Sequence, residues 1–140
     1  MAESVLHLRM KDRVSRELVD EGYSVFHEPP FAPSRFLDWS SYRPDLLGVK
    51  TTAHEQEYAF VECETNPSTK RLAAKNFRSV RVQLRLNSTF ALRRLLVVPR
   101  GSLHRLEPSV RYSWETWIYE EDGRFQRFPK AVPPTNDVRR

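Results

Sequence analysis

The chain has 140 residues and a formal net charge of +5 at pH 7. That length is typical of one domain with one core, and 39% hydrophobic with 29% charged residues is an ordinary composition for a globular protein. No run of about 18 apolar residues occurs, and the start of the chain lacks the pattern of a signal peptide, so we expect a cytoplasmic protein with no membrane partner.

Positive charge is concentrated in one segment. Between Thr65 and Leu106 there is no Asp or Glu, whereas ten Lys and Arg residues occur there, most of them Arg. A basic face is often merely solvated, but here no acidic residue compensates it. Because the planar guanidinium of Arg suits phosphate groups, nucleic acid is the leading partner class.

The first part of the chain predicts a helix, a strand and a long loop. Apolar residues recur at helical intervals from Glu3 to Glu21, and Gly22 suits the end of a helix. Residues 23–27 are rich in strand formers. Prolines recur between residues 29 and 44 and exclude a helix or a central strand, which predicts a long irregular loop of the kind that often carries function.

A hairpin with three carboxylates is predicted next. Two apolar runs, residues 46–49 and 57–64, are joined by a polar segment. Glu62 and Glu64 share one face of the second strand, about 6–7 Å apart, and Asp45 can face them from the first strand. Three carboxylates on hydrophobic strands are costly to bury unless a cation neutralises them, so the pattern predicts a divalent metal site.

Two other interpretations of this segment are weaker. The glutamates could form a solvated polar face, but Tyr58 and Phe60 lie on the same face and give it an apolar character. Cys63, the one cysteine, points to the opposite face and is expected to be a core residue rather than a catalytic thiol. The four histidines lack metal-ligand spacing and are expected to be structural or on the surface.

A second helix is predicted to follow the hairpin directly. Asn66 can cap it, Pro67 suits its first position, and it should end near residues 87–88. One face gathers apolar residues and is expected to pack on the sheet: Ala73, Phe77, Val80 and Leu84. The other face gathers basic residues and is expected to form a solvent-facing ridge: Arg71, Lys75, Arg78 and Arg85.

The rest of the chain predicts a buried strand, a short helix or turn, and a terminal hairpin. The strand covers residues 92–98 and the helix or turn residues 102–106. The hairpin pairs residues 114–119 with residues 123–128 and turns at Asp122-Gly123.

The aromatic residues of this hairpin allow two interpretations. Trp114 and Trp117 could stack on bases, but a place in the core or in a dimer interface is preferred. We assign residues 1–128 to one domain and residues 129–140 to a flexible basic tail.

The order helix, strand, strand, strand, helix, strand, with carboxylates on the second and third strands, resembles the PD-(D/E)XK nuclease superfamily. In size and layout it is most similar to archaeal Holliday junction resolvases. Pro44-Asp45 matches the PD of the motif, and Glu62-Cys63-Glu64 occupies the place of E-x-K. The resemblance covers residues 3–100 in element order and implies an α/β, restriction-endonuclease-like αβββαβ core with a mixed central sheet flanked by helices.

The resemblance also implies an activity: Mg²⁺-dependent endonucleolytic hydrolysis of DNA phosphodiester bonds, with branched or structured DNA among the substrates. Asp45 and Glu62 would bind Mg²⁺ or Mn²⁺, and the backbone carbonyl of Cys63 would add an oxygen ligand. Glu64 would bind the metal or orient the attacking water as a general base. No small-molecule cofactor is implied.

Glu64 departs from the motif, because members usually carry a lysine there that polarises the water or steadies the transition-state charge. Some members supply this lysine from the following helix. Lys70, the nearest to the start of that helix, is the first choice, with Lys75 and Lys50 as alternatives. Members also often carry an acidic residue on the first helix, for which Glu17 is preferred to Asp12.

The expected partners are DNA and a second copy of the chain, since two sites can cut two strands. Basic residues of the loop and the second helix would follow the DNA backbone: Arg35, Arg43, Arg71, Lys75, Arg78 and Arg85. The competing function is a catalytically inactive nuclease-fold protein that serves as a nucleic-acid-binding or assembly module, having lost the catalytic lysine.

Overall fold

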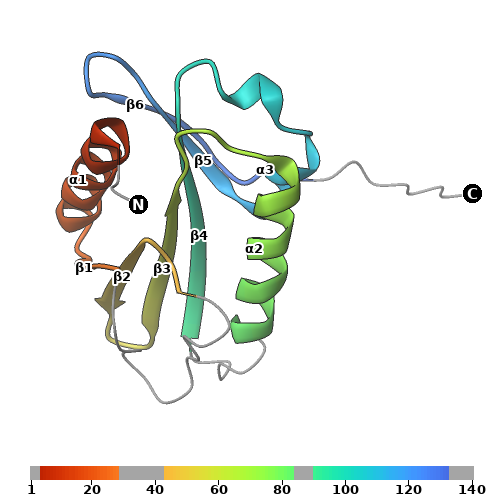
Figure 1. The fold of residues 1–140 in the computed structure, drawn as a ribbon. Coiled ribbons are helices and arrows are strands. Elements are labelled where there is room, and N and C mark those ends of the chain that lie inside the picture. Colours follow the sequence, from red (N-terminus) through yellow and green to blue (C-terminus); the bar gives the residue numbers. More distant parts are fainter. Residues whose placement is uncertain (1–3, 29–42, 84–89, 133–140) are drawn as a thin grey trace, which may run out of the picture.

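We describe a computed structural model of the chain that covers residues 4–28, 43–83 and 90–132 (Figure 1). Most of the predicted proline-rich loop, with Arg35, lies outside these residues, as do Arg85, the predicted end of the second helix and most of the predicted tail. The helices are α1 (Val5–Asp20), α2 (Thr69–Gln83), the 3-10 helix η1 (Leu103–Arg105) and α3 (Ser109–Ser113). The strands are β1 (Ser24–His27), β2 (Leu46–Thr51), β3 (Gln56–Cys63), β4 (Phe90–Pro99), β5 (Glu115–Tyr119) and β6 (Phe125–Phe128).

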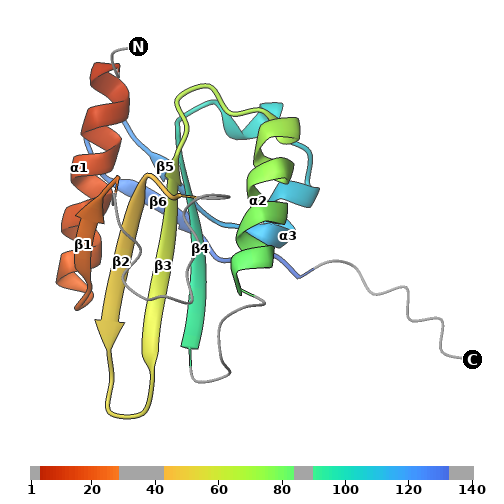
Figure 2. The same ribbon diagram turned by 60° about the horizontal axis from the view of Figure 1, so that its bottom comes forward.

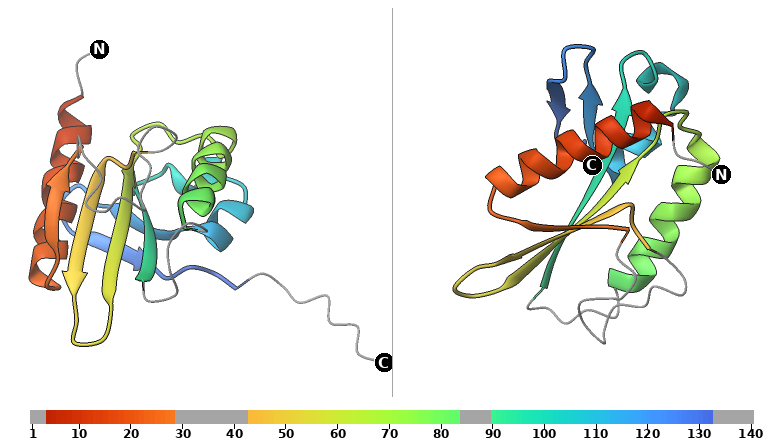
Figure 3. Two further views of the ribbon diagram at one scale, coloured as in Figure 1. Left: turned by 90° about the horizontal axis from the view of Figure 1, so that it is seen from below. Right: turned by 60° about the vertical axis from the view of Figure 1, so that its left-hand side comes forward.

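The strands form one mixed sheet in the order β1-β2-β3-β4-β5-β6 (Figure 2). The neighbours β1 to β3 pair antiparallel, β3, β4 and β5 pair parallel, and β5 and β6 pair antiparallel. Helix α1 covers one face and α2 with α3 covers the other (Figure 3). The predicted α/β fold with a mixed central sheet flanked by helices is therefore confirmed. None of the helices within the described residues has the length and apolar character of a membrane span.

Helix α1 begins and ends where the sequence predicts. The Ser4 hydroxyl accepts a hydrogen bond from the backbone N–H of His7 at 3.1 Å, which satisfies a donor that the first turn leaves open. Gly22 follows the helix with a φ of 98°, a conformation that favours glycine. Between these ends, Met10, Val14 and Leu18 recur on one side and are fully buried against the sheet.

Strand β3 is central, and its two faces carry different groups. Ala59, Val61 and Cys63 join the core beneath α1. Because side chains alternate along a strand, Tyr58, Phe60 and Glu62 point to the opposite face. Tyr58 and Phe60 are buried, so Glu62 continues an apolar face, as predicted.

Helix α2 packs on the sheet through a different face from the one predicted. Leu72 is fully buried against Leu96 and Val98, whereas Ala73 is exposed and Phe77 is 64% exposed. The expectation that Ala73 and Phe77 face the sheet is wrong. Lys75 turns toward the carboxylates of β3, because burying those charges requires a cation near them.

The end of the chain forms the predicted hairpin, and Gly123 in its turn has a φ of 86°. Trp114 and Trp117 are fully or almost fully buried, so they belong to the core. The sequence does not predict α3, because this helix is too short to show helical periodicity.

A half-buried ion pair joins β4 to β5 beneath α1 and makes stability depend on pH. Arg93 donates from Nε and Nη2 to the two carboxylate oxygens of Glu115 at 2.7 Å each, and Trp117 Nε1 donates to Glu115 at 2.8 Å. Burial acts to raise the pKa of Glu115, but the hydrogen bonds and charge of Arg93 outweigh it and hold that pKa below its ordinary value.

We therefore expect the free energy of unfolding lost in Glu115→Gln to be largest above the unfolded-state pKa of Glu115, about 4.3. A lowered folded-state pKa stabilises the fold above that value, and the contribution disappears as the pH falls through the folded-state pKa. Urea unfolding at several pH values measures this, with the exposed Glu121→Gln as control. A loss that stays constant through the acid range would contradict the role assigned to the pair.

Candidate functional site

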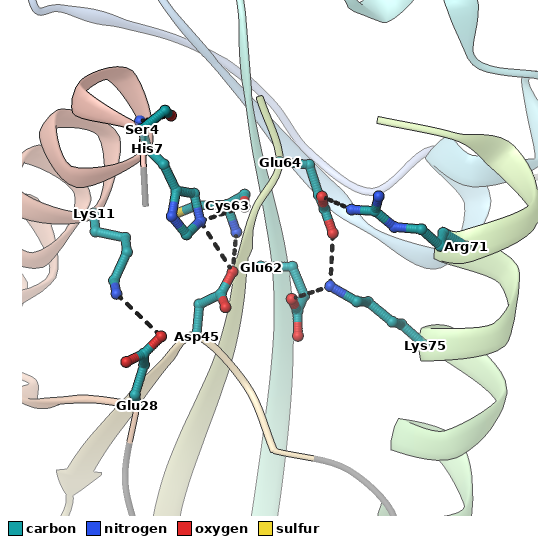
Figure 4. A network of polar contacts seen from close by, with 10 residues as sticks. All are labelled: Ser4, His7, Lys11, Glu28, Asp45, Glu62, Cys63, Glu64, Arg71 and Lys75. Carbon is teal, nitrogen blue, oxygen red and sulfur yellow. Dashed lines mark hydrogen bonds and ion pairs between the residues drawn. The ribbon is translucent and has the colours of Figure 1, made fainter. Parts of the chain in front are cut away.

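The candidate site lies where β2 begins and β3 ends (Figure 4). The two strands run antiparallel with Leu46 opposite Val61, so Asp45, one residue before β2, lies beside the last residues of β3. Asp45 Oδ2 accepts a hydrogen bond of 2.9 Å from the backbone N–H of Cys63. The hairpin register therefore places the Asp45 carboxylate at the end of β3, beside Glu62.

Glu62 and Glu64 share a cation from α2. Lys75 Nζ lies 2.8 Å from Glu62 Oε2 and 2.6 Å from Glu64 Oε1, and Arg71 Nη2 donates to Glu64 Oε2. The residues Glu62 and Glu64 are only 1% and 5% exposed. Because Arg71 and Lys75 are four residues apart on a helix, both reach the same carboxylate.

Lys75 is charged at neutral pH. Burial acts to lower the pKa of Lys75, but the charges of Glu62 and Glu64 and their hydrogen bonds outweigh it, so the net pKa is raised. An ammonium group has donors and no acceptor. Lys75 can therefore stabilise negative charge or orient a water molecule, but it cannot remove a proton.

Helix α1 brings two further residues to this end of the sheet. His7 Nε2 donates to the carbonyl oxygen of Cys63 at 2.8 Å and lies 3.6 Å from Asp45 Oδ2. Lys11 is buried, and its Nζ lies 3.6 Å from Glu28 Oε1. The sequence predicts a structural or surface role for His7. The helical periodicity could have indicated that His7 and Lys11 face the sheet, because they fall on the helix side that also carries the buried Val14 and Leu18.

The cysteine thiol does not fit nucleophilic chemistry. Burial, with the carboxylates of Asp45 and Glu62 nearby, raises the pKa of Cys63 well above its ordinary value. The thiolate is the reactive form of cysteine, so this side chain stays a neutral core group.

Of the residues predicted from the sequence, four contact one another: Glu62, Glu64, Arg71 and Lys75. Asp45 contacts the backbone of Cys63, which lies between the two glutamates. The structure does not bring Lys70 or Glu17 to these residues. Lys70 is exposed on α2. Glu17 lies ten residues beyond His7 on α1, about 15 Å along the helix, and pairs with Arg127 of β6 at 2.6 Å. Arg43 and Arg78 are exposed.

The donor groups decide which residues fit a divalent metal. Within the described residues, no three His, Cys, Asp or Glu side chains form a group arranged to hold a metal ion. Asp45, Glu62 and the Cys63 carbonyl lie at or beside the last residues of β3, and they are hard oxygen donors of the kind that Mg²⁺ and Mn²⁺ prefer. Glu64 fits less well as a ligand, since each of its oxygens already accepts from a cation.

No protein-family model matches the chain, and no curated protein resembles it in sequence. Among solved structures, an XisH family protein from Nostoc punctiforme has 15% sequence identity and a TM-score of 0.50, over 89% of this chain and 99% of that chain. An fdxN element excision controlling factor protein from Anabaena variabilis has 11% identity and a TM-score of 0.50, over 86% of this chain and 98% of its own. At these identities the likeness supports the α/β fold alone.

Proposed function

We propose that this chain is a metal-dependent nuclease that hydrolyses phosphodiester bonds in DNA, with Lys75 in the role of the lysine that Glu64 replaces. The observation that carries the proposal is the Lys75 ammonium within hydrogen-bond distance of both Glu62 and Glu64. A lysine at the third motif position would approach Glu62 from the strand. Here the same charge approaches it from α2.

Each polar group of the site has a distinct part in this proposal. Asp45, Glu62 and the Cys63 carbonyl would hold Mg²⁺ or Mn²⁺. When bound, such an ion activates water and absorbs negative charge on the phosphoryl oxygens. Lys75 donates to the attacking water or to the phosphoryl oxygens. His7 holds the Cys63 carbonyl in place from α1.

The charges of the site also favour a divalent cation. Asp45, Glu62 and Glu64 carry three negative charges at this strand end, and Arg71 and Lys75 carry two positive charges, which leaves a net charge of −1 for these five groups. A divalent ion would turn this net charge to +1, which would complement a bound phosphodiester.

Cleavage assays with isosteric variants test the activity. Supercoiled, linear and four-way-junction DNA are incubated with the protein in Mg²⁺ or Mn²⁺, beside Asp45→Asn and Glu62→Gln and a chelator control. We expect cleavage by the wild-type protein that is lost in both variants. Tight, salt-sensitive binding without cleavage in either metal would contradict catalysis and favour the second candidate.

The second candidate is a nuclease-fold protein that binds nucleic acid without cutting it. Lys75 pairs with both Glu62 and Glu64, so part of the negative charge that would attract a metal is already compensated by the chain itself. In addition, one of the similar structures is described as an excision controlling factor. In either case we propose DNA and a second copy of the chain as partners, and sedimentation of the protein with and without DNA would test both.

A further inference from the structure

Glu64 makes further contacts besides the one with Lys75 that the proposed chemistry uses. Its backbone N–H donates to Val97 O at 2.9 Å, which ties this residue to β4 beyond the end of β3. Its side chain is buried, and its two oxygens accept from different cations, Lys75 on Oε1 and Arg71 on Oε2. The carboxylate therefore contacts two side chains of α2 from a strand end that is hydrogen-bonded to β4.

The two cations held by Glu64 differ in exposure. The Lys75 side chain is 26% exposed and turns inward to Glu62, whereas the Arg71 side chain is 59% exposed (Figure 4). A guanidinium has five N–H donors in a rigid plane, and the described contact with Glu64 uses one nitrogen of that plane. Arg71 therefore presents an oriented donor edge to solvent beside the candidate site.

The surroundings of Arg71 favour an anion. The backbone N–H of Arg71 donates to Ser68 Oγ at 3.1 Å, which fixes it in the first turn of α2. The adjacent Lys70 is exposed, and Arg105, also exposed, donates to Asn66 Oδ1 at 3.1 Å just before this turn. Planar, bidentate donation to paired oxygens is how Arg recognises phosphate.

We propose that Arg71 binds a phosphate of the DNA backbone next to the candidate site, and that Glu64 is a positioning residue that holds the Arg71 guanidinium ready for it. This rests on the DNA-binding part of the proposed function and not on cleavage. An arginine that is already oriented loses less side-chain freedom when it binds than a mobile one. Glu64 would then have a positioning role at the third motif position, where members of the superfamily usually carry a lysine.

If Glu64 positions Arg71, Glu64→Gln should change DNA affinity in the direction opposite to the one expected from charge alone. Removing a negative charge close to bound DNA should tighten binding if Glu64 acts only through its charge. If Glu64 positions Arg71, the isosteric Glu64→Gln should weaken binding instead, because the guanidinium loses its anchor. The sign of this one change separates the two possibilities.

The test is fluorescence anisotropy of a labelled DNA duplex, without divalent metal, over a series of salt concentrations. We expect Arg71→Ala to reduce the slope of log affinity against log salt by about 0.9, the effect of one lost phosphate contact. Glu64→Gln should weaken binding by about 2- to 10-fold in the wild-type background and have no further effect in Arg71→Ala. The matched control is the exposed Arg78 of the same helix, where Arg78→Ala and Glu64→Gln should act additively.

Several results would overturn the proposal: tighter or unchanged binding in Glu64→Gln, an equal loss in the Arg71→Ala background, or no DNA binding by the wild-type protein. If Glu64→Gln does not fold, Arg71→Lys serves instead, since it keeps the charge and loses the planar fork. Wild-type affinity in Arg71→Lys would overturn the proposal that a planar guanidinium oriented by Glu64 makes the contact. Coupling between Glu64 and Arg71 without any DNA cleavage would contradict the nuclease and leave this inference standing.

Discussion

Replacing Lys75 by methionine is expected to lower the rate of metal-dependent DNA cleavage by about 10²–10³-fold, the usual effect of removing one group that stabilises transition-state charge. The Lys75 ammonium lies 2.8 Å from Glu62, so it is the lysine of α2 that the structure places beside the proposed metal ligands. Its pKa is raised by Glu62 and Glu64, so it carries its charge throughout the neutral range. The measurement is single-turnover cleavage at saturating metal.

The matched control is Lys70→Met. Lys70 belongs to the same helix, has the same side chain and is exposed, so we expect its loss to reduce DNA affinity modestly while leaving the rate in the bound complex near that of the wild-type protein. Lys75→Met also leaves Glu62 and Glu64 without their shared cation, so its folding is checked by circular dichroism at the assay temperature. Equal rates for the two variants would remove Lys75 from the mechanism.

The position of Asp45 beside Glu62 could be predicted from sequence because a hairpin fixes its own register. Two apolar runs joined by a short polar segment pair in one way that buries both, and the residue preceding the first run then lies beside the end of the second. The same local signals, helical periodicity, Gly22 and the Asp122-Gly123 turn, predict the order of the other elements, with the short helix α3 as the exception. These features depend on residues that are close in sequence.

The rotation of α2 could not be predicted in this way. A helical wheel assumes that the apolar side faces the sheet, but here the sheet itself presents buried carboxylates at the end of β3. A helix that supplies Lys75 to these charges must expose part of its apolar surface, and Phe77 is the residue that becomes exposed. Lys70 was preferred because it lies nearest the start of the helix, but position along a helix does not determine where a side chain points, and Lys70 is exposed.

Helix α1 contacts the end of β3 through its N-terminal half, and not through the turn that carries Glu17. Glu17 was preferred as the acidic residue of the first helix, but the N-terminal half of α1, with His7, lies against the end of β3. Glu17 instead pairs with Arg127 of the edge strand β6. Which turn of a helix reaches a site depends on how the helix crosses the sheet, and periodicity carries no information on that crossing.

Replacing Leu72 by alanine is expected to lower the free energy of unfolding by about 2–5 kcal/mol, the usual cost of a cavity at a buried leucine. Leu72 is fully buried and joins α2 to Leu96 and Val98 of β4 and to Val110 of α3. Phe77→Ala is the matched control on the same helix. Because Phe77 is 64% exposed, its replacement should change the free energy of unfolding by no more than about 0.5 kcal/mol.

Urea unfolding of the two variants distinguishes the observed packing of α2 from the face that the helical wheel predicts. If Phe77 faced the sheet, Phe77→Ala would cost about 3–5 kcal/mol and Leu72→Ala little, so the order of the two losses would reverse. The result bears on the site as well as on the fold. Leu72 lies next to Arg71 and three residues before Lys75, so the rotation that buries Leu72 is the one that carries both cations to Glu64.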